Sequence, residues 1–157
     1  MPLRLAERLR DRIRRDGPIS FADFMEAALY DPGDGYYSRG APIGEPGDFV
    51  TSPSVSPAFA ATLARLFARD AASLAGDLTF AEVGAGDGRF LSDFGRALER
   101  DRPEVAAHTR LVAVERAPVA RERLAARGLT VIPEIAGTPL RGWIFANELY
   151  DALPVVR

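Results

Sequence analysis

A carboxylate and three closely spaced glycines form the part of the sequence best suited to bind a ligand. They run Glu82-Val83-Gly84-Ala85-Gly86-Asp87-Gly88, directly after a short apolar stretch and directly before a helical pattern that opens at Arg89. This order predicts a strand, a tight turn and a helix N-terminus, the first unit of a nucleotide-binding α/β domain. Glycines let the backbone turn sharply and let a ligand lie against it without meeting a Cβ atom.

The spacing of the glycines indicates which kind of ligand the turn binds. A dinucleotide turn has the pattern G-x-G-x-x-G, whose third glycine would fall at position 89, where this chain has arginine. The pattern present, E-x-G-x-G-x-G, resembles motif I of the S-adenosylmethionine (SAM) methyltransferases. The alternative is a flexible loop without a ligand, which the flanking strand and helix disfavour. The resemblance implies a set of cofactor-binding residues: Glu82, Gly84, Ala85, Gly86, Asp87 and Gly88.

Polar side chains also follow other predicted strands. Residues 110–115 form a second buried strand that ends on Glu115, one strand–helix unit after the glycine turn. In doubly wound folds an acidic residue at this position accepts hydrogen bonds from a ribose diol, so we expect Glu115 to bind the cofactor ribose.

Residues 36–56 lack regular periodicity and precede a helix that Ser56 and Pro57 begin. A loop of this length inside a compact domain is more often functional than idle. Its hydroxyl, carboxylate and aromatic side chains could cover a bound ligand, and we assign Thr51 and Ser52 to the cofactor site. The alternative is a surface segment that wraps over the core.

Apolar periodicity and turn residues predict the elements that position these side chains. We expect a parallel sheet in the order 3-2-1-4, with nine residues, 133–141, joining the third and fourth strands without a helix. Fully extended, such a link spans about 30 Å, enough to cross two intervening strands. The expected helices are 3–15, a short one after Ser20, 56 to about 74, 89–102 and 118–127, and the expected strands are 79–83, 110–115, 129–132 and 143–146.

Length and composition limit the classes of function. The 157 residues suit one domain, and 47% hydrophobic with 27% charged residues is typical of a globular protein. A net charge of −2 argues against a general nucleic-acid binder, and the absence of cysteine with one histidine argues against a metal site. No apolar run reaches the roughly 18 residues of a membrane span. We expect a cytoplasmic protein, or one of the mitochondrial matrix if the source is eukaryotic, with neither membrane nor nucleic-acid partners.

Four blocks of sequence, in order, resemble the MidA family of SAM-dependent methyltransferases, which includes a protein arginine methyltransferase of mitochondrial complex I assembly. The most distinctive blocks are residues 47–53, Gly-Asp-Phe-Val-Thr-Ser-Pro, and residues 146–154, Ala-Asn-Glu-Leu-Tyr-Asp-Ala-Leu-Pro. The other two are residues 24–37, around Tyr-Asp-Pro and Gly-Tyr-Tyr, and the glycine turn itself. The resemblance covers nearly the whole chain. It implies an α/β, Rossmann-like class I SAM methyltransferase fold with S-adenosyl-L-methionine as the cofactor.

The resemblance also implies a substrate and catalytic residues. The reaction would be methyl transfer from SAM to a protein arginine, so a protein substrate is the expected partner. Asn147, Glu148 and Asp151 follow the fourth strand, where amine-directed methyltransferases place polar groups around the acceptor nitrogen. Glu148 and Asp151 could orient a guanidinium by bidentate hydrogen bonds. Alternatively, Asn147 caps a turn and Asp151 an outgoing helix.

The family fold has seven strands, and this sequence stops just after its fourth. We expect residues 1–56 to form a helical and loop segment that covers the cofactor site, and residues 57–157 a partial SAM-binding domain. The fourth strand would then be an open sheet edge prone to self-association, and these residues alone would transfer little methyl. A non-catalytic SAM-binding or assembly module is the alternative function, and a nucleotide-dependent oxidoreductase is a second one.

Overall fold

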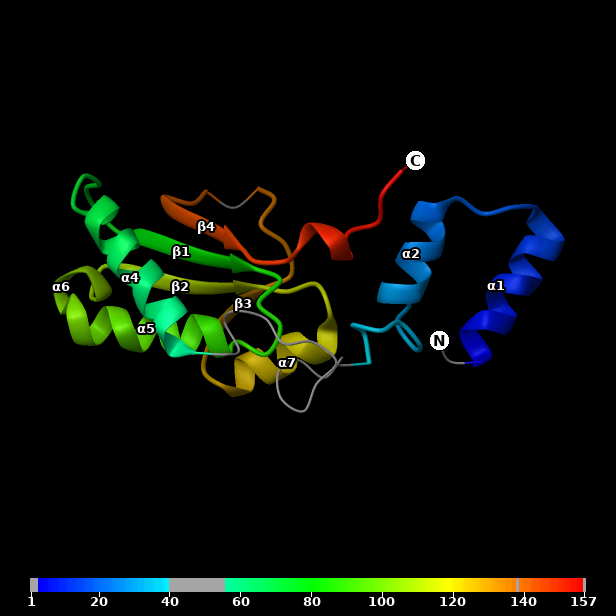
Figure 1. Cartoon of the computed structure of the whole chain (residues 1–157), viewed down its shortest axis with the longest axis horizontal. Helices are drawn as coiled ribbons and strands as arrows, with labels where there is room; N and C mark the ends of the chain where they lie inside the picture. The colour runs from blue at the N-terminus through cyan, green and yellow to red at the C-terminus, as the bar shows by residue number, and fades with distance from the viewer. Residues whose placement is uncertain (1–2, 40–55, 138, 157) are drawn as a thin grey trace.

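A parallel sheet lies at the centre of the molecule (Figure 1). The structure, a computed structural model, describes residues 3–39, 56–137 and 139–156. Within these ranges, four strands pair in the order β3-β2-β1-β4, which confirms the predicted order. The strands are β1 (Leu78–Val83), β2 (Thr109–Val114), β3 (Thr130–Ile132) and β4 (Gly142–Ala146).

One face of the sheet packs against three helices, α4 (Pro57–Ala71), α5 (Arg89–Asp101) and α7 (Pro118–Ala126). Aromatic rings fill the space between the sheet and α4 and α5. Phe80 of β1 and Phe94 of α5 are fully buried, with their ring centroids 3.8 Å apart. Phe67 of α4 meets both rings edge-on. This packed face fixes β1, and with it the turn that follows β1.

The other face of the sheet has a thinner cover. Ala81, Val112 and Val114 lie buried there beneath Ile135 and Leu140, which belong to the link between β3 and β4. As predicted, the described part of this link contains no helix. Ile144 of the edge strand β4 is in register with Ala81 but remains 63% exposed. The edge strand therefore presents apolar surface.

Two helix ends differ from the prediction. Ser56 caps α4 as expected, since its Oγ accepts a hydrogen bond from the Ala58 amide at 3.1 Å. However, α4 ends at Ala71 rather than near Leu74, because Leu74 is half exposed and gains little from a further helical turn. After α5, Pro103 begins a short additional helix, α6 (Pro103–Ala106), which is too brief to produce a periodic pattern.

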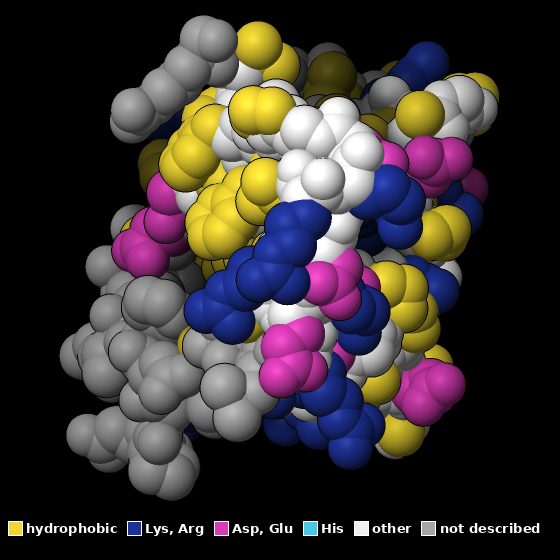
Figure 2. Space-filling model, turned by 90° about the vertical axis from the view of Figure 1, so that its right-hand side faces the viewer, with side chains coloured by type: hydrophobic (Ala, Val, Ile, Leu, Met, Phe, Trp, Pro, Cys, Tyr) yellow, Lys and Arg dark blue, Asp and Glu magenta, His cyan; other side chains and the backbone are white. Residues whose placement is uncertain are grey.

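The N-terminal residues form two helices beside the α/β body, α1 (Leu3–Asp16) and α2 (Phe21–Tyr30) (Figure 1). The predicted cap of α2 is confirmed: the Asp23 amide donates to Ser20 Oγ at 3.0 Å. Arg8 of α1 is bound to two carboxylates of the turn that follows α2, those of Asp31 and Asp34. Arginine and acidic side chains intermingle on this face of the molecule (Figure 2). The division of the chain at residue 56 stays a prediction.

Candidate functional site

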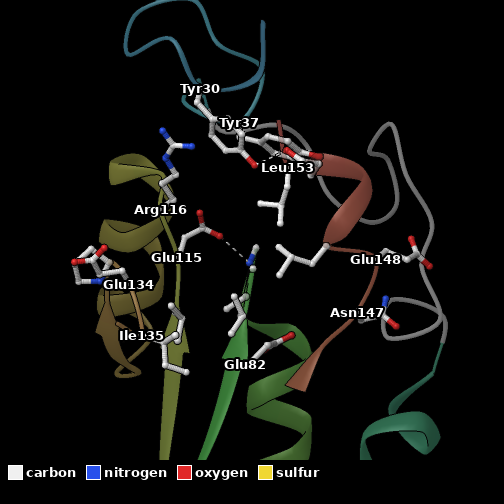
Figure 3. A pocket seen from close by; sticks show the side chains of 18 of the residues that line it. Tyr30, Tyr37, Glu82, Glu115, Arg116, Glu134, Ile135, Asn147, Glu148 and Leu153 are labelled. Carbon is white, nitrogen blue, oxygen red and sulfur yellow. Dashed lines mark hydrogen bonds between the residues drawn. The ribbon is translucent and has the colours of Figure 1, made fainter. Parts of the chain in front are cut away.

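A cavity of about 440 Å³ lies at the carboxyl ends of the parallel strands. Open α/β sheets bind their ligands at this edge. The segments that follow all four described strands line it, and Tyr30 and Tyr37 come from the N-terminal part of the chain (Figure 3). Six of its described lining residues are acidic and one is basic: Glu82, Asp87, Glu115, Glu134, Glu148 and Asp151, with Arg116.

The glycine turn forms one wall of this cavity. Gly84 and Gly86 both have positive φ, +75° and +54°, which a residue with a Cβ atom rarely adopts. The Gly84 amide donates to the Val114 carbonyl at 2.9 Å and so ties the turn to β2. Asp87 accepts a hydrogen bond from the Arg89 amide at 3.0 Å, at the start of α5. Gly84, Ala85, Gly86 and Asp87 all line the cavity, as the sequence pattern predicts for a ligand-binding turn.

Gly88 has a different role from the one expected of it. It is not among the described residues that line the cavity, and it is buried at the start of α5. A Cβ atom at this position would lie 2.5 Å from Leu124 Cδ2 and 2.8 Å from Leu129 Cδ1. The third glycine therefore allows α5 to approach α7 and the start of β3 closely, rather than allowing a ligand to approach the turn.

Glu115, which follows β2, is hydrogen-bonded to the glycine turn. Its Oε2 accepts a hydrogen bond from the Gly86 amide at 3.3 Å, and its Oε1 accepts one from the Ala117 amide at 2.8 Å (Figure 3). The carboxylate also lines the cavity. A carboxylate has about four lone-pair sites, so these two bonds leave Glu115 able to accept hydrogen bonds from a ligand.

Glu82 at the end of β1 lies in an apolar setting. The residue is 6% exposed, and the Leu91 amide of α5 donates to its carboxylate. Its Oε2 is buried and has no hydrogen-bond partner among the described residues. Burial raises the pKa of Glu82 well above its usual value, and the nearby carboxylates of Asp87 and Glu115 raise it further.

Two of the three predicted acceptor-side residues, Asn147 and Glu148, lie across the cavity from Glu115 (Figure 3). Asn147, Glu148 and Asp151 all line it. Asn147 and Glu148 are carried on the segment after β4, with their side chains on the side away from Glu115 (Figure 3). Glu148 is exposed and has a positive φ of +48°, an unusual conformation for this residue type. Asp151 lies inside a short 3-10 helix, η1 (Tyr150–Ala152), and does not cap a longer helix there.

The sequence did not identify Tyr30 and Arg116, which lie at the cavity on its N-terminal side. Tyr30 donates its hydroxyl hydrogen bond to the Ala152 carbonyl at 2.9 Å, and its ring stacks on Tyr37. The Arg116 guanidinium lies 4.3 Å from the centre of the Tyr30 ring and forms a two-point ion pair with Glu26 of α2. Burial raises the pKa of both phenols, so they stay neutral at ordinary pH. These contacts join α2 to the body across the cavity mouth.

Other predictions are outside what the structure tests. Thr51 and Ser52 lie outside the described residues. Across residues 3–39, 56–137 and 139–156, no group of three or more metal-ligating side chains is close enough to hold a metal ion. Within the same ranges, no helix has the length and apolar character that a membrane crossing requires.

Comparisons with known proteins agree with this geometry. The family described as "Putative S-adenosyl-L-methionine-dependent methyltransferase" matches residues 60–157. The mitochondrial protein arginine methyltransferase NDUFAF7 of Xenopus laevis is 30% identical over 177 residues, covering 92% of this chain and 40% of the relative. The Bos taurus protein of the same name is 35% identical over 91 residues, which cover 57% of this chain and 21% of the relative.

A solved structure shares the fold. A Burkholderia thailandensis protein, crystallised with bound S-adenosyl-homocysteine (SAH), superposes with a TM-score of 0.74 at 32% identity. The match covers 96% of this chain and 42% of that protein. The chain thus spans less than half the length of the relatives it matches. Because the family match takes in more than half of its residues, this chain belongs to the MidA family of SAM-dependent methyltransferases.

Proposed function

We propose that this chain forms the cofactor-binding part of a SAM-dependent methyltransferase whose acceptor is a protein arginine. One observation carries the proposal: a glycine turn and the carboxylates of two neighbouring strands meet in one cavity at the carboxyl edge of the sheet. The family to which the chain belongs supports the cofactor, and relatives named protein arginine methyltransferases support the acceptor.

The residues present fit a SAM molecule. The sulfonium and ammonium groups of SAM are cationic, and Glu82 offers a buried oxygen without a partner beside the turn. The cavity walls at Gly84 and Gly86 lack a Cβ atom, and Glu115 has free acceptor capacity for ribose hydroxyls. Bound SAM supplies an activated methyl group. The protein then has to orient the acceptor nitrogen and keep its lone pair free.

Asn147, Glu148 and Asp151 are the residues we assign to the acceptor. All three line the cavity, Asn147 and Glu148 lie on its far side from Glu115, and Glu148 is exposed. A carboxylate here can hold a planar guanidinium by two parallel hydrogen bonds, which orients the nitrogen that is methylated. The other reading, in which Asn147 and Asp151 only shape the turn after β4, would leave methyl transfer unchanged when they are substituted.

The cofactor assignment is tested by Glu115→Ala. Removing a charged acceptor of ribose hydrogen bonds should weaken SAH binding by about 1–3 kcal/mol, or roughly 5- to 150-fold. Isothermal titration calorimetry measures this loss, with Glu122→Ala, an exposed glutamate of α7, as the matched control. Equal affinities in the wild type and Glu115→Ala would place the ribose elsewhere.

The acceptor assignment is tested by Glu148→Gln in a protein that contains this sequence and is as long as the relatives. Methyl transfer to an arginine peptide should fall at least about tenfold, the effect of roughly 1.4 kcal/mol in the transition state. The affinity for SAH should stay near that of the wild type. The reverse pattern, lost SAH binding with normal turnover at saturating SAM, would assign Glu148 to the cofactor.

Three further assignments belong to the same proposal. Residues 1–56 would cover the cofactor site, as the contacts of Tyr30 and Arg116 with both sides of the cavity suggest. The edge strand β4, where Ile144 is exposed, would promote self-association; Ile144→Lys should then reduce any dimer seen by analytical ultracentrifugation.

The Xenopus laevis and Bos taurus relatives are named as mitochondrial proteins. A fluorescent fusion would show whether this chain enters mitochondria or stays in the cytoplasm.

A further inference from the structure

The buried carboxylate of Glu82 has a property that its role as a cofactor ligand does not explain. One of its oxygens has no partner among the described residues, although the residue is 6% exposed. An ionised carboxylate buried in this way would lose its hydration and gain a single backbone hydrogen bond, from Leu91. Burial of an uncompensated charge is costly, and such groups usually take up a proton instead.

The charged groups nearest to Glu82 make its ionisation harder. Asp87 on the glycine turn and Glu115 at the end of β2 are both acidic and act on it through space. Arg116 is the one basic side chain among the described residues that line the cavity, and it already binds Glu26 and lies over the Tyr30 ring. None of these groups offers Glu82 a positive partner.

In the described parts of the elements packed around Glu82, no basic side chain acts on its carboxylate. In the sheet, its neighbours in register are Ala113 of β2 and Phe145 of β4, neither of which ionises. Phe59 of α4 packs on Phe145 from the helical face. The first turn of α5 contributes the Leu91 amide. No described residue supplies the missing partner of Glu82, and a ligand in the cavity that Glu82 lines would supply it.

We propose that Glu82 holds a proton in the ligand-free protein and releases it when the cationic methionine end of SAM or SAH binds. The ligand cation then replaces the proton as the partner of the carboxylate, so the buried site never holds a lone negative charge. This inference rests on the proposed function, since it requires a SAM site at the turn. It adds that cofactor binding is coupled to the release of a proton.

The direction of the resulting pH dependence follows from linkage. The pKa of Glu82 is raised in the free protein and falls when a cation binds, so the complex holds fewer protons than its free components. Cofactor affinity should therefore rise with pH by up to about tenfold per unit, and level off above the pKa of the free protein. Measurements below about pH 7 avoid most of the titration of the ligand's own amino group.

Proton release can be counted by calorimetry in buffers of different ionisation enthalpy, using the wild-type chain and three ligands. SAM carries a sulfonium and an ammonium group, SAH carries the ammonium group, and 5′-methylthioadenosine carries neither. We expect release of about 0.5–1 proton with SAM and SAH and about none with methylthioadenosine. Binding of SAM and SAH without proton release would overturn the inference and leave the proposed function standing. If neither ligand binds, the proposed function itself fails.

The source of the proton is tested by Glu82→Gln, with Glu122→Gln on the exposed face of α7 as the matched control. Glutamine preserves the shape of the side chain but removes its negative charge, so SAH should bind more weakly, with no proton release and little pH dependence. The control should release as many protons as the wild type. Proton release that survives in Glu82→Gln would assign it to Asp87 or Glu115 and overturn the inference. Should Glu82→Gln fail to fold, the three-ligand comparison in the wild type decides alone.

Discussion

The α/β body and helix α2 are stabilised by different kinds of contact. In the body, large apolar side chains such as Phe67, Phe80 and Phe94 are completely buried between the sheet and its helices. Helix α2 has no fully buried residue, and its contacts with the body include the ion pair and ring contact of Arg116 and the hydrogen bond of Tyr30. Apolar burial contributes much more free energy than exposed polar links. The wall of the cavity that the body provides is therefore held more firmly than the wall that α2 provides.

The largest expected effect contrasts two phenylalanines, one from each region. Phe80→Ala should lower the free energy of unfolding by about 3–5 kcal/mol, because it leaves a cavity among the rings of the core. Phe24 of α2 is 41% exposed, and Phe24→Ala should cost less than about 1 kcal/mol. Urea denaturation followed by circular dichroism measures both. Similar losses at the two sites would show that α2 is as firmly packed as the body.

A pair of glycines provides a finer test within the body. Gly88 and Gly128 both have positive φ, +73° and +80°, but only Gly88 is crowded. A methyl group at Gly128 would meet nothing within 4 Å, so Gly128→Ala should cost the backbone strain alone, about 1–2 kcal/mol. Gly88→Ala should cost about 2–5 kcal/mol, because overpacking against Leu124 and Leu129 adds to the strain. Equal losses of stability in Gly88→Ala and Gly128→Ala would mean that α7 shifts to make room for the added methyl group at little cost in free energy.

A small and local effect should come from Arg116→Gln. This change removes the ion pair with Glu26 and the ring contact with Tyr30, which together contribute about 0.5–2 kcal/mol at a partly exposed site. Hydrogen exchange should quicken in α2 and remain unchanged in β1 and α5. Arg100→Gln, which breaks an exposed pair with Asp101 in the body, is the matched control and should leave α2 as it is. Unchanged hydrogen exchange in α2 would mean that other contacts hold α2 against the body.

Much of the body could be predicted from the sequence, because its determinants are local. The buried strands appear as short apolar runs. Ser56 and Pro57 predict the start of α4, because serine caps a helix by accepting a hydrogen bond and proline has a fixed φ that suits the first helical position. The end of α4 was placed too late because apolar Leu74 continues the pattern, although in the fold it is half exposed. Whether an apolar residue is buried depends on the neighbours that other elements supply.

The same distinction separates the predicted and the unpredicted parts of the site. Glu82 and Glu115 could be found because each ends a strand at a fixed offset from the glycine turn. Tyr30 and Arg116 could not, because their partners lie 122 and 90 positions away in the chain. Gly88 shows a subtler limit: its place in the motif was correct, but its closest neighbours come from α7 and the residue before β3.

The hydrogen bond from Tyr30 to Ala152 has a consequence for biosynthesis. A ribosome adds about 5–20 residues per second, so the 122 positions that separate the partners take roughly 6 to 24 s to synthesise. Tyr30 leaves the ribosome early, and its acceptor does not yet exist. Throughout this interval the hydroxyl of Tyr30 cannot form this hydrogen bond, so α2 lacks one of its contacts with the body. The aromatic core, built from residues close in sequence such as Phe80, Phe90 and Phe94, can begin to assemble first.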